Sequence, residues 1–529
     1  MSEAMIGSVT MSTDSDEGQT LQDNVSLVNT DEEDPPPQYD TLSFQFCEET
    51  ERSLDDVLTD IKFGRFHILI ILLGGTAYFA VCSELMVFVF LNEPIKKEWH
   101  LSDMVFPWLP FCNGLASMFG EYLFGILSDR HGRQFTFVLT VSICCIFAIG
   151  STFATNFPIL VVFRSFVSFG KGGLAALAFV LPIEFLPRQK RSYLIIITMC
   201  GTLGTAFTGA MAWLLIPTHG WRYFVVACAT PFLITLIFRL FARYESPRFL
   251  MISGEKEQAW MVVTKIAQIN KTPLPAGKLS GIPSHSRGQI KDLFTREFRY
   301  RTLTISLVWL FQATGYWGVT TYLPQYMSDK LNLGGYFIIF IIFISELPGL
   351  FLALFFIRKN MLGRITSVIL FICMTIVLLA VFAVLSTSHL IWAQTLTIMT
   401  CFAFMAPIYS ILNTFTPEIY PTAIRSTALG WVYMVSNIPG LITPFIDATL
   451  LDSPVVWLYP VVWLMFFVLE FVVMLSIRTE TAGKRLSDNL QSTPICENIP
   501  SFVPDHIPDC TAPIYSSEPP FRYRQDGYL

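Results

Sequence analysis

The stretch GILSDRHGR, residues 125–133, follows the second of a series of long apolar segments. A shorter version, NMLGR at residues 360–364, follows the eighth segment, so that Arg133 and Arg364 take equivalent places. This recurrence indicates that the chain consists of two related halves. Two other pairs of stretches recur in the same order at nearly the same separation: EFLPRQKR (184–191) with EIYPTAIR (418–425), and ESPRFL (245–250) with ETAGKRL (480–486).

The composition indicates a membrane protein. Hydrophobic residues make up 53% of the 529 positions and charged residues 14%, against about 25% charged residues in soluble domains. A helix that crosses a bilayer needs roughly 20 apolar residues. We therefore predict an all-α membrane protein with twelve transmembrane helices in two pseudo-symmetric six-helix bundles. Runs of spanning length lie at about 66–91, 103–127, 134–155, 157–183, 192–216, 221–243, 301–327, 333–357, 365–386, 389–414, 427–450 and 455–477.

Polar stretches divide the chain into five parts. Residues 1–60 contain sixteen acidic residues and one basic residue, Arg52. No signal-peptide pattern opens the chain. The predicted parts are an acidic cytosolic tail with a short amphipathic helix (1–65), the first bundle (66–243), a cytosolic central loop (244–300), the second bundle (301–478) and a cytosolic, mostly disordered C-terminal tail (479–529).

The distribution of basic residues predicts the orientation. Most Lys and Arg residues outside the apolar runs lie on the side shared with both chain termini. Cytosolic loops of membrane proteins carry such an excess, so we expect both termini in the cytosol. The opposite side has only Lys96, Lys97, Arg222 and Lys330.

The motifs resemble the major facilitator superfamily. Its signature Gly-x-x-x-Asp-Arg-x-Gly-Arg matches residues 125–133, and Arg-x-x-x-Ser-x-Gly-x-Gly at 164–172 is similar to its second motif. ESPRFL and ETAGKRL resemble the sugar and organic-ion transporter branch. Within it, four stretches resemble the synaptic vesicle 2-related group, which implies a vesicle membrane, with the plasma membrane as the alternative: LDDVLTDIKFGRF (54–66), SELPG (345–349), TPEIYPTAIRSTALG (416–430) and LITPFIDA (441–448).

The chain departs from the superfamily pattern at several positions. The second copy of the signature has Asn360 and Met361 in place of Asp-Arg, which predicts a weaker second latch. The first span keeps one acid, Glu84, where the family has a pair. Asn437 in the eleventh span stands where relatives often carry a charge.

The resemblance implies a gate at the cytosolic ends of the helices. Ion pairs among the motif residues would hold that side shut and exchange partners as the two halves rock. The alternative is static charge that only anchors the helices. The candidate gate residues are Gly125, Asp129, Arg130, Gly132, Arg133, Glu184, Arg191, Glu245, Arg248, Glu418 and Arg425.

Charges inside the spans are informative because each costs a few kcal/mol at the bilayer centre unless it is paired or hydrated. The family arrangement would bring Glu84 towards Arg164 and Lys171, either as a coupling device or as a permanent ion pair. Glu346 precedes a Pro-Gly step, which is typical of a hinge or ligand contact, with a structural role as the alternative. Glu121 and Glu470 have no partner that the sequence suggests, and we interpret both as structural.

Aromatic residues could wall an organic substrate and stack on a cation. Tyr316, Trp317 and Tyr409 are the candidates, and simple packing is the alternative for each. With Glu84, Arg164, Lys171 and Glu346 they form the predicted substrate and coupling set.

Two short motifs overlap in the acidic tail. Pro36, Pro37 and Tyr39 fit the PPxY ligand of WW domains. Tyr39 and Leu42 fit an adaptor-binding endocytic signal. The tail therefore predicts a WW-domain or adaptor protein as partner.

These patterns favour a secondary transporter of a small organic solute, including an organic ion, with proton coupling. The alternative is a vesicle-membrane binding or trafficking protein that keeps the transporter fold without completing the cycle. The sequence contains no phosphate-binding G-x-x-x-x-G-K-[ST] loop, no metal-ligand spacing and no nucleophile–base pattern. We therefore expect no enzyme activity, no cofactor, no metal and no nucleic-acid partner.

Overall fold

The structure is a computed structural model. Three groups of residues from the sequence analysis lie outside the part that it describes: the tail residues Pro36, Pro37, Tyr39 and Leu42; Asn360 and Met361; and residues 482–529. The described residues are 51–101, 105–106, 108–273, 278–279, 290–331, 340–341, 343–358, 362–388, 390–451, 457–477 and 480–481.

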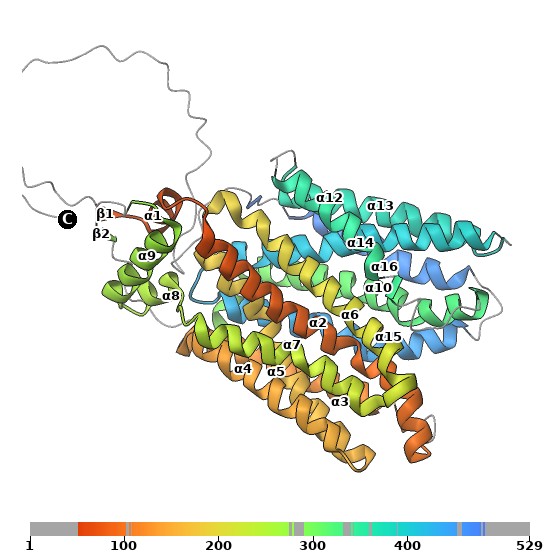
Figure 1. The fold of residues 1–529 in the computed structure, drawn as a ribbon. Helices are drawn as coiled ribbons and strands as arrows, with labels where there is room; N and C mark the ends of the chain where they lie inside the picture. The colour runs from red at the N-terminus through yellow and green to blue at the C-terminus, as the bar shows by residue number, and fades with distance from the viewer. Residues whose placement is uncertain are drawn as a thin grey trace, which may run out of the picture. The chain divides into compact units, whose positions relative to one another are not determined.

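The described chain is almost entirely helical (Figure 1). Its one sheet is a parallel pair of two-residue strands, β1 (Glu51–Arg52) and β2 (Lys278–Leu279). The long helices of the first half are α2 (Arg65–Trp99), α3 (Trp108–His131), α4 (Arg133–Gly150), α5 (Phe157–Phe185), α6 (Ile195–His219) and α7 (Trp221–Phe241). Those of the second half are α10 (Arg299–Leu331), α12 (Leu347–Arg358), α13 (Arg364–Leu385), α14 (Ile391–Ile419), α15 (Arg425–Leu451) and α16 (Leu458–Leu475).

Each predicted apolar segment carries one of these helices. Among the described residues, eight helices are long and apolar enough to cross a membrane: α2, α4, α5, α6, α7, α13, α14 and α16. The helices α3, α10 and α15 are also long, and α12 is a shorter apolar helix.

Single residues make the tight connections between helices. Gly132 alone separates α3 from α4, and Gly220 alone separates α6 from α7. Their φ angles are +101° and +89°, in the left-handed region that side-chain-bearing residues rarely adopt. At the start of α5, the Asn156 side chain accepts a hydrogen bond from the Ile159 backbone N–H, which fixes the first turn. The positive φ angle at position 132 is the reason that the signature has a glycine there.

The two halves meet mainly along α3 and α15. Two glycines allow these backbones to approach closely. A Cβ atom on Gly125 would lie 3.0 Å from the Ser426 carbonyl oxygen, and one on Gly430 would collide with the Glu121 carbonyl oxygen. We call this contact the α3–α15 seam.

Short elements gather at one end of the long helices (Figure 1): α1 (Leu54–Asp60), α8 (Pro247–Ile252) and α9 (Lys256–Asn270). This end also carries the recurring motifs, and we call it the motif end. The apolar face of α1 is buried in the core through Leu54, Val57 and Leu58, and α9 buries Val263 and Ile266. The segment before the first span is thus packed on the bundle.

An ion pair lies at the opposite end of the first half. Glu98, beyond the apolar part of α2, accepts hydrogen bonds from Trp221 at 2.5 Å and from Arg222 at 2.8 Å at the start of α7. Burial would raise the pKa of the Glu98 carboxyl, but the hydrogen bonds from Arg222 and Trp221 outweigh it and hold that pKa below its ordinary value.

Close packing of α6 on α2 gives a stability prediction. A Cβ atom on Gly204 would collide with the Phe79 carbonyl oxygen, whereas one on Gly209 would lie 3.6 Å from its nearest neighbour, Phe340. We expect Gly204→Ala to lower the free energy of unfolding by about 1–3 kcal/mol because the helices must separate. Gly209→Ala should leave the protein as stable as wild type. Thermal unfolding of the detergent-purified variants measures both, and equal melting temperatures would contradict the prediction.

Candidate functional site

A cavity of about 140 Å³ lies between the two halves. Its wall is made by α2, α3, α5 and α6 from the first half and by α10, α14, α15 and the residue before α12 from the second. A dry cavity of about 150 Å³ in another protein accepts benzene. The space therefore suits a molecule of about one ring.

Most of the predicted substrate residues line this cavity. Lys171, Glu346, Tyr316, Trp317 and Tyr409 are all on its wall. They come from α5, from the turn before α12, from α10 and from α14, so only the folded arrangement brings them together.

Glu346 joins the two halves across the cavity. Its Oε1 accepts a hydrogen bond from the Tyr316 hydroxyl at 2.9 Å, and its Oε2 accepts one from the Thr202 hydroxyl at 3.0 Å. Thr202 is on α6 of the first half, whereas Tyr316 is on α10 of the second. Both donors are neutral. The carboxyl group thus sits in a polar environment without a cationic partner among the described residues.

Glu121 makes a second link between the halves, which the sequence analysis missed. Its carboxylate accepts hydrogen bonds from Ser117 at 3.0 Å and from the Asn437 amide at 2.6 and 2.7 Å. We had interpreted Glu121 as structural and noted Asn437 only as a lost charge. One signal was available: Glu121, Gly125 and Asp129 are spaced four apart, so they share one face of α3 with the signature.

Glu84 and Arg164 lie behind the cavity wall. They form an ion pair with both side chains nearly fully buried. One Glu84 oxygen and two Arg164 nitrogens have no hydrogen-bond partner within the described structure. Lys171, seven residues after Arg164, instead reaches the cavity and forms no ion pair or hydrogen bond with any described residue.

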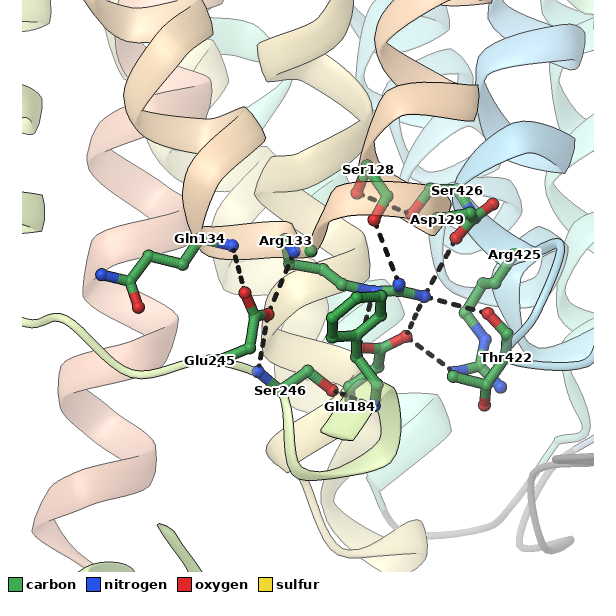
Figure 2. Close-up of polar contacts among 12 residues, drawn as sticks. Ser128, Asp129, Arg133, Gln134, Glu184, Glu245, Ser246, Thr422, Arg425 and Ser426 are labelled. Atoms are coloured by element: carbon green, nitrogen blue, oxygen red, sulfur yellow. Dashed lines mark hydrogen bonds and ion pairs between the residues drawn. The ribbon is translucent and has the colours of Figure 1, made fainter. Parts of the chain in front are cut away.

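At the motif end, the predicted gate residues of the first half form a network around Arg133 (Figure 2). The buried Arg133 guanidinium donates to Glu184 at 3.1 and 3.2 Å and to Asp129 at 2.9 Å. Glu245 accepts hydrogen bonds from the backbone N–H groups of Arg133 and Gln134 at 3.0 and 3.1 Å. Each buried acid is thereby paired within the first half.

The same network crosses to the second half. Asp129 accepts hydrogen bonds from the Thr427 backbone N–H at 2.7 Å and from its hydroxyl at 2.8 Å. Arg133 donates to the Thr422 carbonyl oxygen at 2.9 Å, and Arg425 donates to Glu184 at 3.2 Å. Figure 2 shows the contacts of Arg133 with Thr422 and of Glu184 with Arg425. They close the motif end of the α3–α15 seam.

The second half repeats the internal part of this network. Arg364 donates to Glu418 at 3.3 and 3.4 Å, as Arg133 does to Glu184. Glu480 accepts from the backbone N–H groups of Arg364 and Ile365, as Glu245 does at the equivalent turn. The repeat seen in the sequence therefore holds at the level of single hydrogen bonds.

Three predicted gate residues take other positions. Arg191 and Arg248 both donate to Asp55 of α1, which the sequence analysis did not single out. Asp55 is 5% exposed. Arg130 is exposed and has no ion pair or hydrogen bond with a described residue. The two neighbouring signature arginines, Arg130 and Arg133, thus differ completely in environment.

The chain belongs to the major facilitator superfamily, which its residues 72–444 match. Members of this family are transporters. The computed fold is similar to the solved proton:xylose symporter XylE with bound 6-bromo-6-deoxy-D-glucose, with a TM-score of 0.66 and 20% sequence identity over 81% of this chain and 98% of that chain. This likeness confirms the predicted fold class.

Two curated relatives show the nearer resemblance. The chain is 30% identical over 475 residues to the synaptic vesicle 2-related protein of Xenopus laevis, covering 85% of each chain. It is 26% identical to organic cation/carnitine transporter 7 of Arabidopsis thaliana, covering 84% of this chain and 97% of the relative. The predicted resemblance to the synaptic vesicle 2-related group is therefore confirmed.

The contrast between Arg133 and Arg130 gives a second stability prediction. Arg133→Gln leaves the buried Asp129 without its cation and Glu184 with Arg425 alone, and removing one partner of such a pair costs about 3–5 kcal/mol. Arg130→Gln removes an exposed charge and should change the melting temperature little. Thermal unfolding of both purified variants tests this difference. If Arg130→Gln were as damaging as Arg133→Gln, the network would not be the stabilising element.

Proposed function

We propose that the protein is a secondary transporter that carries a small organic solute across its membrane by alternating access. The observation that supports this most directly is a solute-sized cavity between the halves, together with a seam that closes one end of it by contacts between α3 and α15. A transporter of this kind opens its midplane site to one side at a time by rocking one repeat against the other.

The hydrogen-bond pattern suits such rocking. Arg133 with Glu184, and Arg364 with Glu418, are pairs within one half, so they can remain intact when the halves separate. The links from Asp129 to Thr427 and from Glu184 to Arg425 cross between the halves and must break. Asp129 and Glu184 keep Arg133 of their own half, so opening does not leave these two buried acids without a cation.

The motif end faces the cytosol in this proposal, and both termini lie on that side. The excess of Lys and Arg on this side of the sequence supports that orientation. The resemblance to synaptic vesicle 2-related proteins favours an intracellular vesicle membrane. The tail motif of Pro36, Pro37, Tyr39 and Leu42 would then present a WW-domain or adaptor-binding site in the cytosol.

Glu346 is the coupling carboxyl that we propose, in place of Glu84. It lines the cavity, where a proton can reach it, and its partners Thr202 and Tyr316 come from different halves. Protonation of Glu346 would change the hydrogen bonding between the halves. Glu84 is held by Arg164 outside the cavity wall, which favours the packing role for that pair.

A disulfide across the seam tests alternating access. The hydroxyl oxygens of Ser128 and Ser426 lie 3.3 Å apart on opposite halves, so the double variant Ser128→Cys/Ser426→Cys can form a cross-link. Native Cys82 lines the cavity and reports access. In oriented vesicles, we expect cross-linking to reduce labelling of Cys82 by an impermeant maleimide from the cytosolic face about tenfold or more, with recovery on reduction. Peptide mass spectrometry measures the labelling.

The matched control is Ser83→Cys/Thr208→Cys. These hydroxyl oxygens lie 2.7 Å apart within the first half, so the cross-link should leave cytosolic access unchanged. Cytosolic labelling that is equal with and without the seam disulfide would exclude the seam as gate. If Cys82 is never labelled from the cytosolic face, even without a cross-link, the protein does not cycle and the alternative of a non-transporting membrane protein holds.

Proton coupling through Glu346 predicts a pH-dependent balance between the two open states. The ratio of Cys82 labelling from the two faces should change roughly fivefold or more between about pH 5.5 and about pH 7.5. Taking the ratio of labelling from the two faces removes the effect of pH on the reactivity of the Cys82 thiol itself. Glu346→Gln should abolish the change, because the amide cannot be ionised. Glu470→Gln, which alters a buried carboxyl of α16 away from the cavity, should retain it; a pH effect that survives Glu346→Gln would disprove this role.

A further inference from the structure

Lys171 is the ammonium group on the cavity wall, and its hydrogen-bonding capacity is unused. It projects from α5 into the space between the halves. An ammonium carries three N–H donors and no acceptor. Among the described residues, none forms an ion pair with it within 4.0 Å or accepts its hydrogen bonds. Glu84 and Glu121 attract Lys171 electrostatically, but neither forms a hydrogen bond or ion pair with it. Because a charge within a membrane protein is costly without a direct partner, Lys171 can accept an anion from outside the protein.

The acids nearby already have other partners. Both oxygens of Glu346 accept hydrogen bonds, from Tyr316 and Thr202. Both oxygens of Glu121 accept hydrogen bonds from Asn437. Glu84 is paired with Arg164. Each of these acids therefore has a direct partner in the protein, whereas Lys171 has only the longer-range attraction of Glu84 and Glu121.

Aromatic side chains make up much of the remaining wall. Tyr316 packs with its ring centre 5.8 Å from that of Trp317 and 6.0 Å from that of Tyr409. Tyr78 and Tyr433 also face the cavity. Aromatic rings favour flat, apolar partners in stacked or edge-on contact. The wall thus offers one cationic point and several ring surfaces in a space of about one ring.

We propose that the substrate site binds a small aromatic carboxylate, with the carboxylate on Lys171 and the ring among Tyr316, Trp317 and Tyr409. This assignment rests on the proposed transport function and names the substrate class of the same cavity. A cationic solute would meet the like charge of Lys171 in a space of about one ring. A neutral polyol would leave Lys171 without a direct ion pair. A carboxylate satisfies the ammonium and leaves the existing hydrogen bonds intact.

Three probes of one shape separate charge from ring packing. Benzoate, benzamide and benzylamine have the same ring with an anionic, a neutral and a cationic substituent. Each is titrated against the full-length purified protein while its melting temperature is measured, because a ligand that binds only the folded state raises that temperature. We expect the apparent affinity for benzoate to exceed that for benzamide about tenfold or more, as one charge-assisted hydrogen bond requires. Benzylamine should not stabilise the protein.

Variants at Lys171 connect the effect to this side chain. Lys171→Met should abolish stabilisation by benzoate, whereas Lys171→Arg should retain it. Lys171→Met removes no described ion pair, so the ligand-free variant should melt at or above the wild-type temperature. Lys265→Met, on α9 over the Tyr244 ring, is the control that alters a lysine away from the cavity and should keep the benzoate effect.

Each other outcome overturns the assignment. Stabilisation by benzamide or benzylamine equal to that by benzoate excludes the carboxylate. An unchanged benzoate effect in Lys171→Met excludes the residue, and no effect of any probe excludes the aromatic carboxylate class. The seam cross-link needs no ligand, so these failures leave alternating access standing. If Cys82 were never labelled from the cytosolic face, that result would instead disprove transport itself.

Discussion

A buried arginine in a membrane protein is costly unless it has a partner, and at two equivalent places the structure supplies an acid. Arg133 and Arg364 are each almost fully buried and each is held by an acid of its own half, Glu184 or Glu418. A second acid, Glu245 or Glu480, accepts the backbone N–H groups at the start of the following helix. The pairs fix the helix ends within each half, so that the halves can act as rigid bodies against each other.

Contact between the halves depends on small residues and weaker bonds. Gly125 and Gly430 let the backbones of α3 and α15 approach. Neutral donors then cross the seam to acids that the first half has already paired, as Thr427 does to Asp129. Such a hydrogen bond helps to close the motif end, and when it breaks Asp129 keeps its ion pair with Arg133. The proposed cycle uses the difference between the ion pairs within each half and the mostly neutral hydrogen bonds that cross the seam; the Arg425–Glu184 ion pair also crosses it and must break too.

The seam also reaches the cavity. Glu121 and Asp129 lie on the same face of α3, two turns apart, and both accept hydrogen bonds from α15. A solute bound at Lys171 would share the cavity with Glu121, which lies at the inner end of the same contact that closes the motif end. Coupling between the cavity and the motif end then needs no series of intervening residues, because one rigid helix, α3, carries both Glu121 and Asp129.

Much of this protein could be predicted from the sequence, because periodicity and repetition are local properties. Apolar runs predicted the positions of the helices, and the recurrence of Arg133 as Arg364 predicted two related halves. The family arrangement predicted that Glu84 would lie near Arg164, which it does, whereas the placement of Lys171, Glu346 and Tyr316 on one cavity wall is known only from the structure. The partner of Glu121 could not be predicted, since Asn437 lies 316 positions away on a helix of the other half. Nor could Asp55, whose contact with Arg191 and Arg248 depends on how α1 packs on the bundle. Sequence determines which segments become helices and which charges need partners; only the packing of the helices decides which partner each charge receives, because that choice depends on distances between segments remote in the chain.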